Sequence, residues 1–306
     1  MLNWKNLKEK QPELFDIIII ALNEDDLTNH SKWLIGQYLQ SDDKSFYGVV
    51  IDFDETGQDI AIKYDRIKFW SPLFEGGYQL PPEFKEEDLP MFYEAFRKLI
   101  LSYEYRFLAM AKLSKTAAGK VYPLDLYFDG IYNRALSLTN ATLTLLDSKN
   151  YMAAASIVRL HLDNFLRLNA AWLVAKPHDF VLEVMGGTPI NKIKDRNGKK
   201  MLDSHLVDEA SKNYLWIKEI YVKACGFVHF SGTHIFSHQK ILDKNERTIG
   251  TYIGKGDWDN VTDKSRIEVL AVMIEISDCI LKLAYDWART KMQENDLENF
   301  IKNESK

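Results

Sequence analysis

The stretch SIVRLHLDNFLRLNAAW, residues 156–172, decides the fold of this chain. Apolar residues occur almost all the way round the helix that its spacing predicts, and such a helix usually lies at the centre of its domain. The same helix carries charged and polar side chains, and a buried charge costs several kcal/mol unless it is paired. The sequence therefore predicts a central helix whose polar groups either pair with one another or line a pocket.

Three charged residues of this helix share one face. Arg159, Asp163 and Arg167 are spaced i, i+4, i+8, so the aspartate can pair with either arginine. Two interpretations follow, a structural ion-pair ladder that fixes helix packing and a polar pocket with a chemical purpose. His161 lies off the stripe of these three residues, and Asn164, three positions further on, shares the face of His161.

Outward from this helix, the second half of the chain is predicted to be helical throughout. A mainly α fold follows, a helical bundle with a small β-hairpin in its N-terminal region. The helices are predicted, by their 3.6-residue spacing, over residues 86–113, 124–148, 150–175, 203–214, 215–230 and 262–293. Asp203 or Ser204 is the expected cap of the helix that begins there.

The first part of the chain has a different pattern. Residues 11–40 are predicted to form two helices, and residues 46–70 a β-hairpin around the turn ETGQ, because their strands are β-branched and aromatic. A break in SKTAAGKVYP places a boundary near residue 120. We therefore predict two domains, residues 1–120 with the N-terminal helices and hairpin, and residues 121–306 with the helical bundle.

Composition narrows the class of protein. The chain has 306 residues and a net charge of −5, which is unlike a dedicated nucleic-acid binder. Its two cysteines form no CxxC pair, so a structural zinc site is not expected. The first residues lack a signal peptide's apolar core, and no apolar run approaches the 18 residues of a membrane span. The expectation is a cytoplasmic protein without a membrane partner or a cofactor.

Three histidines lie within ACGFVHFSGTHIFSH, residues 224–238. His234 and His238 have the i, i+4 spacing of helical metal ligands, but no acidic residue stands between them as in HExxH, and no metal site is predicted. A serine hydrolase would need a nucleophile elbow, GxSxG, which is absent. Hydrogen bonding between helices is the preferred interpretation for His238.

Two loops complete the list of candidate sites. The stretch KIKDRNGKK, residues 192–200, contains an Asn-Gly turn and four basic residues that are the natural phosphate contacts if RNA binds: Lys194, Arg196, Lys199 and Lys200. Residues 250–260, GTYIGKGDWDN, lack the GK[ST] ending of a phosphate-binding loop and are predicted to be a loop before the last helix.

Two stretches, NRALSLTNATLTLLDSKNYMAAASIVRLHLDNFLRLNAAW and YVKACGFVHFSGTHI, resemble a group of bacterial helical proteins that is similar to the HEPN superfamily. The resemblance covers residues 125–290 at most. It implies a helical bundle, often dimeric, and for many members a metal-independent ribonuclease of toxin–antitoxin or phage-defence systems. In such enzymes a histidine acts as acid or base on the RNA 2′-OH, and an arginine stabilises the phosphate charge.

The sequence departs from the superfamily signature, an arginine followed after four to six residues by a histidine. The nearest match is Lys223, which five intervening residues separate from His229, and lysine is a poorer bidentate phosphate ligand. The resemblance then implies Arg159 and His229 as the catalytic pair. The supporting residues would be His161, Asp163, Asn164, Lys223, Ser231 and His234.

Three functional hypotheses remain. The first is the ribonuclease, with RNA as substrate, a second copy of the chain in a homodimer, and an antitoxin or defence protein as partner. The second is a non-catalytic helical module that binds another molecule, in which Arg159 and Asp163 are structural. The third, a metal-dependent hydrolase that uses His229, His234 and His238, has the least support.

Overall fold

The computed structural model describes residues 5–10, 12, 17–25, 34–40, 47–51, 60–63, 67–72, 86–116, 120–243, 247–258 and 261–291. The predicted mainly α fold is confirmed. Contacts divide the chain into one unit of residues 1–77, 102–121 and 281–306 and another of residues 78–101 and 122–280. The second unit, called the helical unit below, holds every candidate site residue. The predicted domain boundary near residue 120 stays a prediction.

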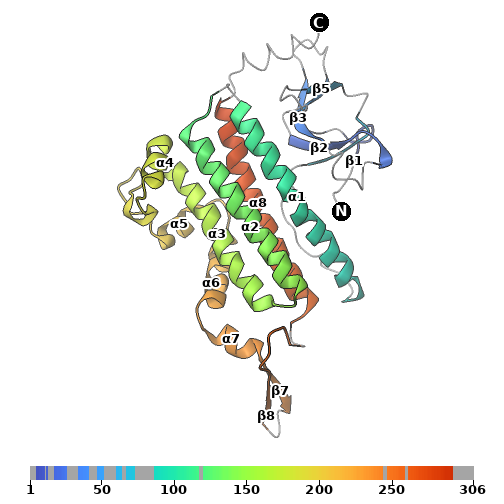
Figure 1. Cartoon of the computed structure of the whole chain (residues 1–306), viewed down its shortest axis with the longest axis vertical. Helices are drawn as coiled ribbons and strands as arrows, with labels where there is room; N and C mark the ends of the chain where they lie inside the picture. The colour runs from blue at the N-terminus through green and yellow to red at the C-terminus, as the bar shows by residue number, and fades with distance from the viewer. Residues whose placement is uncertain are drawn as a thin grey trace. The chain divides into compact units, whose positions relative to one another are not determined.

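The helical unit is built on two antiparallel helices, α2 (Pro123–Asp147) and α3 (Tyr151–Leu173). The connection is only three residues long because Lys149 adopts a positive φ of 55° and the Asn150 side chain caps α3 by accepting the N–H of Ala153 at 3.3 Å. Figure 1 shows α8 (Asp263–Lys291) running alongside this pair up to the end of the unit at residue 280.

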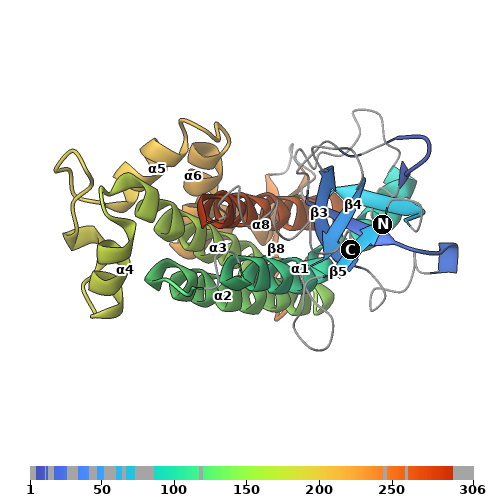
Figure 2. The same cartoon turned by 90° about the horizontal axis from the view of Figure 1, so that it is seen from above.

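The central position predicted for residues 156–172 is confirmed. Apolar side chains of α3 are buried on several sides of the helix, among them Leu162, Phe165, Leu166 and Leu168, all at most 1% exposed. Figure 2 shows the reason, since α3 lies between α2 on one side and α5 and α6 on the other. An amphipathic surface helix would have needed only one apolar stripe.

Three short helices cover α3, and a fourth follows them. They are α4 (Pro177–Met185), α5 (Asp203–Ala210), α6 (Ile217–Val228) and α7 (Gly232–Ser237). Between α4 and α5 the chain makes a short 3₁₀ turn (Ile190–Lys192) and then the predicted Asn-Gly turn, in which Gly198 takes a φ of +80°. That turn folds Asp203 back onto α3.

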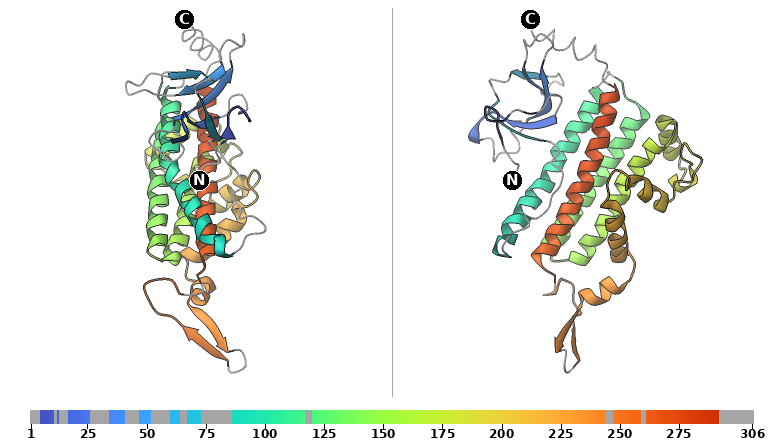
Figure 3. Two further views of the ribbon diagram at one scale, coloured as in Figure 1. Left: turned by 90° about the vertical axis from the view of Figure 1, so that its right-hand side faces the viewer. Right: turned by 180° about the vertical axis from the view of Figure 1, so that it is seen from behind.

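After α7 the chain forms a hairpin that the sequence analysis did not predict. Strands β7 (Gln239–Asp243) and β8 (Thr248–Thr251) pair antiparallel, with Ile241 opposite Ile249. The predicted loop over residues 250–260 is therefore wrong at its first two positions, which belong to β8. Figures 1 and 3 show the hairpin projecting past the ends of the helices of this unit.

The first unit contains an antiparallel sheet where two helices were predicted. Residues 17–21 form strand β2 (Ile17–Ala21) and residues 34–40 form β3 (Leu34–Gln40), so the helices predicted over 11–40 are wrong in their described parts. Ile17 pairs with Gln37 and Ile20 with Leu34. A short apolar run is ambiguous between strand and helix, and four consecutive β-branched isoleucines favour the strand.

The hairpin predicted over residues 46–70 is confirmed for β4 (Tyr47–Ile51) and β5 (Ile60–Lys63), which pair antiparallel. Its turn, residues 55–58, lies outside the described residues. The end of the predicted second strand instead forms β6 (Phe69–Pro72), which pairs with β2 and with β1 (Lys5–Asn6). The strand order is β1-β6-β2-β3-β4-β5.

The long helix predicted over residues 86–113 forms as a 3₁₀ turn (Glu86–Asp88) followed by α1 (Leu89–Thr116). It contributes residues to both units, as does α8. Within the helical unit, Arg97 of α1 makes a two-point ion pair with Asp147 at the end of α2, at 2.9 and 3.4 Å.

Candidate functional site

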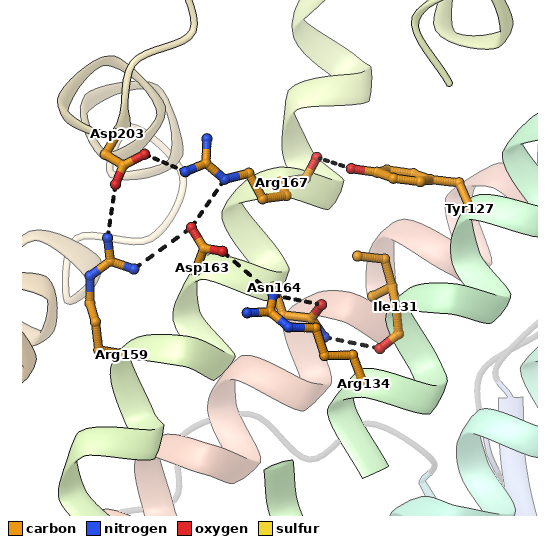
Figure 4. A network of polar contacts seen from close by, with 8 residues as sticks. All are labelled: Tyr127, Ile131, Arg134, Arg159, Asp163, Asn164, Arg167 and Asp203. Atoms are coloured by element: carbon orange, nitrogen blue, oxygen red, sulfur yellow. Dashed lines mark hydrogen bonds and ion pairs between the residues drawn. The ribbon is translucent and has the colours of Figure 1, made fainter. Parts of the chain in front are cut away.

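A network of ion pairs joins α2, α3 and α5, and Asp163 of α3 lies at its centre (Figure 4). Its carboxylate accepts the Arg167 Nε at 3.0 Å and lies 3.8 Å from the Arg159 Nη1. These are the i, i+4 pairs that the sequence predicts. The Asp163 side chain is 21% exposed and those of the two arginines 12% and 22%, so these three side chains are mostly shielded from water.

A second carboxylate from α5 completes the network. Asp203 accepts Arg159 Nη2 on one oxygen at 3.0 Å and Arg167 Nη2 on the other. The predicted capping role of Asp203 or Ser204 is wrong, because Leu202 occupies the N-cap and Asp203 is the first helical residue. Its carboxylate turns toward two guanidinium groups, which offer stronger, charge-assisted hydrogen bonds than a backbone N–H.

The network reaches α2 through Arg134. Its Nη1 lies 3.5 Å from an Asp163 oxygen and donates to the Asn164 side-chain oxygen at 3.4 Å. The Asn164 side chain is fully buried and also donates to the carbonyl of Ile131 at 2.9 Å, while Tyr127 donates to the carbonyl of Arg167 at 3.1 Å (Figure 4). Three arginines and two aspartates thus tie α2 and α5 to the central helix.

Arg159 has further partners on α6. Its guanidinium lies 4.4 Å from the centre of the Tyr221 ring and donates to the Tyr221 hydroxyl at 3.2 Å. Burial alone would lower the pKa of Arg159, but hydrogen bonds to Tyr221 and Cys225 and the charge of Asp163 raise it. This arginine is thereby fixed by two carboxylates and an aromatic ring, as in a structural ion-pair ladder.

His161, a predicted supporting residue, points away from this network. It is fully buried, and its Nε2 lies 2.9 Å from the hydroxyl of Ser277 on α8. That hydroxyl donates to the Met273 carbonyl, so it accepts a hydrogen bond from the Nε2–H of the neutral imidazole. Burial, with help from the charge of Arg134, lowers the pKa of His161 to about 3. The imidazole is therefore neutral at physiological pH and serves packing between α3 and α8.

The predicted catalytic pair is not joined by a contact. His229 is exposed at the C-terminal cap of α6, and within the described residues no hydrogen bond, ion pair or ring contact links its side chain to Arg159. Both residues do reach Cys225: Arg159 bonds its side chain, and the His229 N–H donates to its carbonyl at 3.0 Å. Catalytic roles for these two residues stay a prediction.

The other predicted supporting residues near His229 have local partners. Lys223 forms an exposed ion pair with Glu219 at 2.6 Å. The hydroxyl of Ser231 donates to the Gly226 carbonyl at 2.7 Å, which closes the end of α6. His234 stacks on Phe230, with ring centres 5.8 Å apart. None of these contacts, among those of the described residues, leads to the Asp163 network.

His238 has a structural environment. Its Nδ1 lies 2.9 Å from the Ser237 hydroxyl and 3.2 Å from the His234 carbonyl, and its ring stacks on Tyr252 with only 2° between the planes. The preferred interpretation, hydrogen bonding between helices, is replaced by bonding within α7 and stacking against the end of the hairpin. Among the described residues, no group of three histidines, cysteines or acids is placed to hold a metal.

Some side chains of the basic loop hold the fold together, and others are exposed to solvent. The Arg196 guanidinium donates to the carbonyls of Trp172, Leu173 and Val174, which satisfies the C-terminal end of α3. The turn itself is held by the Asp195 carboxylate. It accepts the backbone N–H groups of Asn197 at 2.9 Å and of Lys199 at 2.8 Å, and it lies 2.9 Å from the Nε2 of His205.

Among the described residues, no hydrogen bond or ion pair engages the side chains of the three lysines of the predicted RNA contact. Lys194, Lys199 and Lys200 are exposed, and the backbones of Lys194 and Lys200 form a bridge across the turn. Burial alone would raise the pKa of Asp195, but the hydrogen bonds just described lower it. The carboxylate therefore stays charged in the turn.

Comparison with known proteins gives no match to a family model, to a curated protein sequence or to a solved structure. The resemblance to the HEPN superfamily stays a prediction from the two stretches of sequence that suggested it. Among the described residues, no helix combines the length and the apolar character that crossing a bilayer requires.

Sequence reasoning missed three members of the network: Arg134, Asp203 and Tyr221. One signal pointed to a missing carboxylate, because two arginines on the central helix faced a single aspartate. The two arginines together carry one positive charge more than Asp163 can balance, so shielding both from water calls for a second negative charge. Which acid supplies it depends on how the loop before α5 folds back, and that is a tertiary property.

Proposed function

We propose that the helical unit is a non-catalytic binding module that recognises a protein partner through an apolar surface on α7 and the β7–β8 hairpin. The observation that carries this proposal is the exposure of large apolar side chains within residues 230–253. The exposed fractions are Phe230 83%, Phe236 72%, Ile241 61%, Leu242 60%, Ile249 60% and Ile253 95%. These six residues, called the hairpin surface below, belong to one segment of the chain, and large exposed apolar side chains gathered in this way mark interaction sites.

The hairpin has one supported face and one open face. Gly250 lets Leu242 and Trp258 approach, since a Cβ there would lie 3.1 and 3.2 Å from their side chains. Tyr252 stacks on Trp258 with ring centres 6.0 Å apart. Ile241 and Ile249 are directly opposite one another, so both point to the other face of the strands. A partner that covers this isoleucine pair would bury its apolar surface.

The two-stranded sheet gives a further reason to expect a partner. A two-stranded hairpin is only marginally stable in water, and three or more strands or a covering helix are normally needed. Among the described residues, the sheet contains β7 and β8 alone. Such a hairpin gains from pairing with, or packing against, another chain.

Site-specific photo-crosslinking in the organism that makes the protein tests this proposal. A photoreactive residue at position 249 or 241 should form the same discrete adduct. The matched control is position 182, because Leu182 on α4 is similarly exposed at 55% but lies outside the hairpin surface. The mass of the adduct separates a second copy of this chain from another protein. Equal labelling at position 182, or no discrete adduct at 249 and 241, would contradict the proposal.

A ribonuclease of the HEPN-like type is the second candidate, and one observation favours it. Arg159 and the backbone N–H of His229 both bond Cys225, and the His229 side chain is exposed at the C-terminal cap of α6. An exposed imidazole can transfer a proton, and a guanidinium can stabilise phosphate charge. These are the two groups that phosphate cleavage needs. In this hypothesis the exposed lysines of the basic loop would contact RNA, and a second copy of the chain would complete the site.

Purified protein incubated with total RNA in EDTA tests the second candidate. Cleavage that disappears in His229→Ala and Arg159→Ala, but persists in the exposed control Lys240→Ala, would support the ribonuclease. His229 is exposed, so its variant should keep the fold and any loss would be chemical. Cleavage that EDTA abolishes would instead support metal-dependent hydrolysis, and intact RNA would leave the binding module as the function.

A further inference from the structure

A cavity of about 290 Å³ opens where α3, α6 and α8 meet inside the helical unit. Its volume is at the lower end of the range for small-molecule sites, about 300–1,000 Å³. None of its lining residues belongs to the Asp163 network or to the hairpin surface. The cavity therefore needs an explanation of its own.

Small residues create the space. Each of the three helices places one alanine in the lining: Ala155 on α3, Ala224 on α6 and Ala271 on α8. Ala155 and Ala224 are buried, so their small size leaves unfilled volume where helices usually interdigitate. The hollow is open to water at its exposed lining residues, so a ligand with an apolar body would gain by covering its apolar walls.

Two aromatic rings form part of the wall. Tyr151, at the start of α3, and Phe227, near the end of α6, meet edge to face, with ring centres 5.8 Å apart and an angle of 85°. The arrangement is rigid, because Ser156 donates to the Phe227 carbonyl at 2.9 Å and the Tyr151 N–H donates to Asp257 at 2.7 Å. Aromatic faces attract organic cations through their ring quadrupole.

One carboxylate in the lining is uncommitted. Glu268 of α8 is exposed, and among the described residues no hydrogen bond or ion pair engages it. Its charge acts on the cavity, since after burial it is the main reason that the pKa of Tyr151 is raised. The cation in the lining, Lys223, is neutralised by Glu219 at 2.6 Å. The unbalanced charge of the cavity is therefore negative.

We infer that this cavity binds a small organic cation with an apolar body, an aliphatic or aromatic amine whose ammonium group lies beside Glu268. The apolar part would fill the space between the three alanines. The aromatic pair and the carboxylate favour a positive head group over a neutral or negative one of the same shape. The site does not depend on the hairpin surface and would exist with either function proposed above.

Three probes of one shape test the inference: 2-phenylethylamine, 2-phenylethanol and 3-phenylpropanoate, with binding measured by ligand-observed NMR. The amine should bind about fivefold tighter than the alcohol, the effect of one unit charge near a surface carboxylate. The carboxylate probe should bind most weakly. Equal affinity of amine and alcohol, tighter binding of the carboxylate probe, or no binding of the amine would overturn the inference.

Variants of the lining residues test whether the probes bind in this cavity and whether Glu268 causes the preference for the amine. Glu268→Gln should make the amine and the alcohol bind equally, while Glu183→Gln, the same charge change on exposed α4, should leave the preference intact. Ala271→Leu should weaken both probes, and it is the mildest filling variant because Ala271 is only half-buried. An amine preference that persists in Glu268→Gln, or binding of both probes that Ala271→Leu leaves unchanged, would place the site elsewhere and contradict the inference.

Discussion

The Asp163 network and the hairpin surface use their residues in opposite ways. In the network, charged groups that look chemically active are paired with one another across α2, α3 and α5. On the hairpin surface, apolar groups that would normally be buried are exposed, with Phe230 and Ile253 at 83% and 95%. Unusual residues in a core are thus explained by their partners, whereas unusual residues on a surface call for a partner.

The largest expected effect concerns the centre of the network. Asp163→Ala should lower the free energy of unfolding by about 2–4 kcal/mol, because Arg159 and Arg167 would then share the carboxylate of Asp203 and Arg134 would lose its ion-pair partner. Urea unfolding measures it, with Asp208→Ala as the control. Asp208 is 56% exposed and pairs only with Lys218 at 3.4 Å. A loss no larger than that of the control would show that the network does not hold the helices together.

Acid should destabilise the helical unit through His161. The unfolded chain binds a proton on this histidine near pH 6.5, the folded chain only near pH 3, so stability is complete above about pH 6.5 and falls as the pH drops toward 3. From about pH 7.5 to about pH 5 the loss should be about 2 kcal/mol. His161→Gln, which keeps a donor for Ser277, should lose correspondingly less. Identical pH dependence in both proteins would contradict the burial of a neutral imidazole.

A variant of Arg196 tests whether this side chain stabilises the fold or is available to contact RNA. Arg196→Ala should lower the free energy of unfolding by about 1 kcal/mol, because three carbonyls at the end of α3 lose a charged donor. Lys199→Ala, an exposed control in the same turn, should change stability far less. Thermal denaturation compares the two, and equal effects would return Arg196 to the candidate RNA contacts.

The smallest stability effect is expected on the hairpin surface. Ile249→Ser should change the free energy of unfolding by less than about 0.5 kcal/mol, since the side chain is 60% exposed. The same change should nevertheless remove the adduct that a photoreactive residue at position 241 forms. A large loss of stability with an unchanged adduct would mean that Ile249 packs within the fold and that the partner binds elsewhere.

Much of the helical part of the fold was predictable. The helices over residues 124–148 and 150–175 appear nearly at the predicted bounds, because each carries a continuous 3.6-residue pattern between clear breaks. Strands β2 and β3 were not, since a short apolar run such as Ile17–Ile20 has no periodicity that separates a buried strand from a buried helix. Pairing with residues 34–37, distant in sequence, settles that choice.

The candidate site divides in the same manner. The sequence by itself determined the central helix and the Arg159–Asp163–Arg167 face, because side chains four residues apart meet on any α-helix. The tertiary structure alone decided that Asp203 and Arg134 join this face, that His161 turns toward Ser277, and that the hairpin presents its isoleucines to solvent. Spacing along a helix fixes near neighbours, whereas contacts between helices depend on how loops return the chain, which no local pattern records.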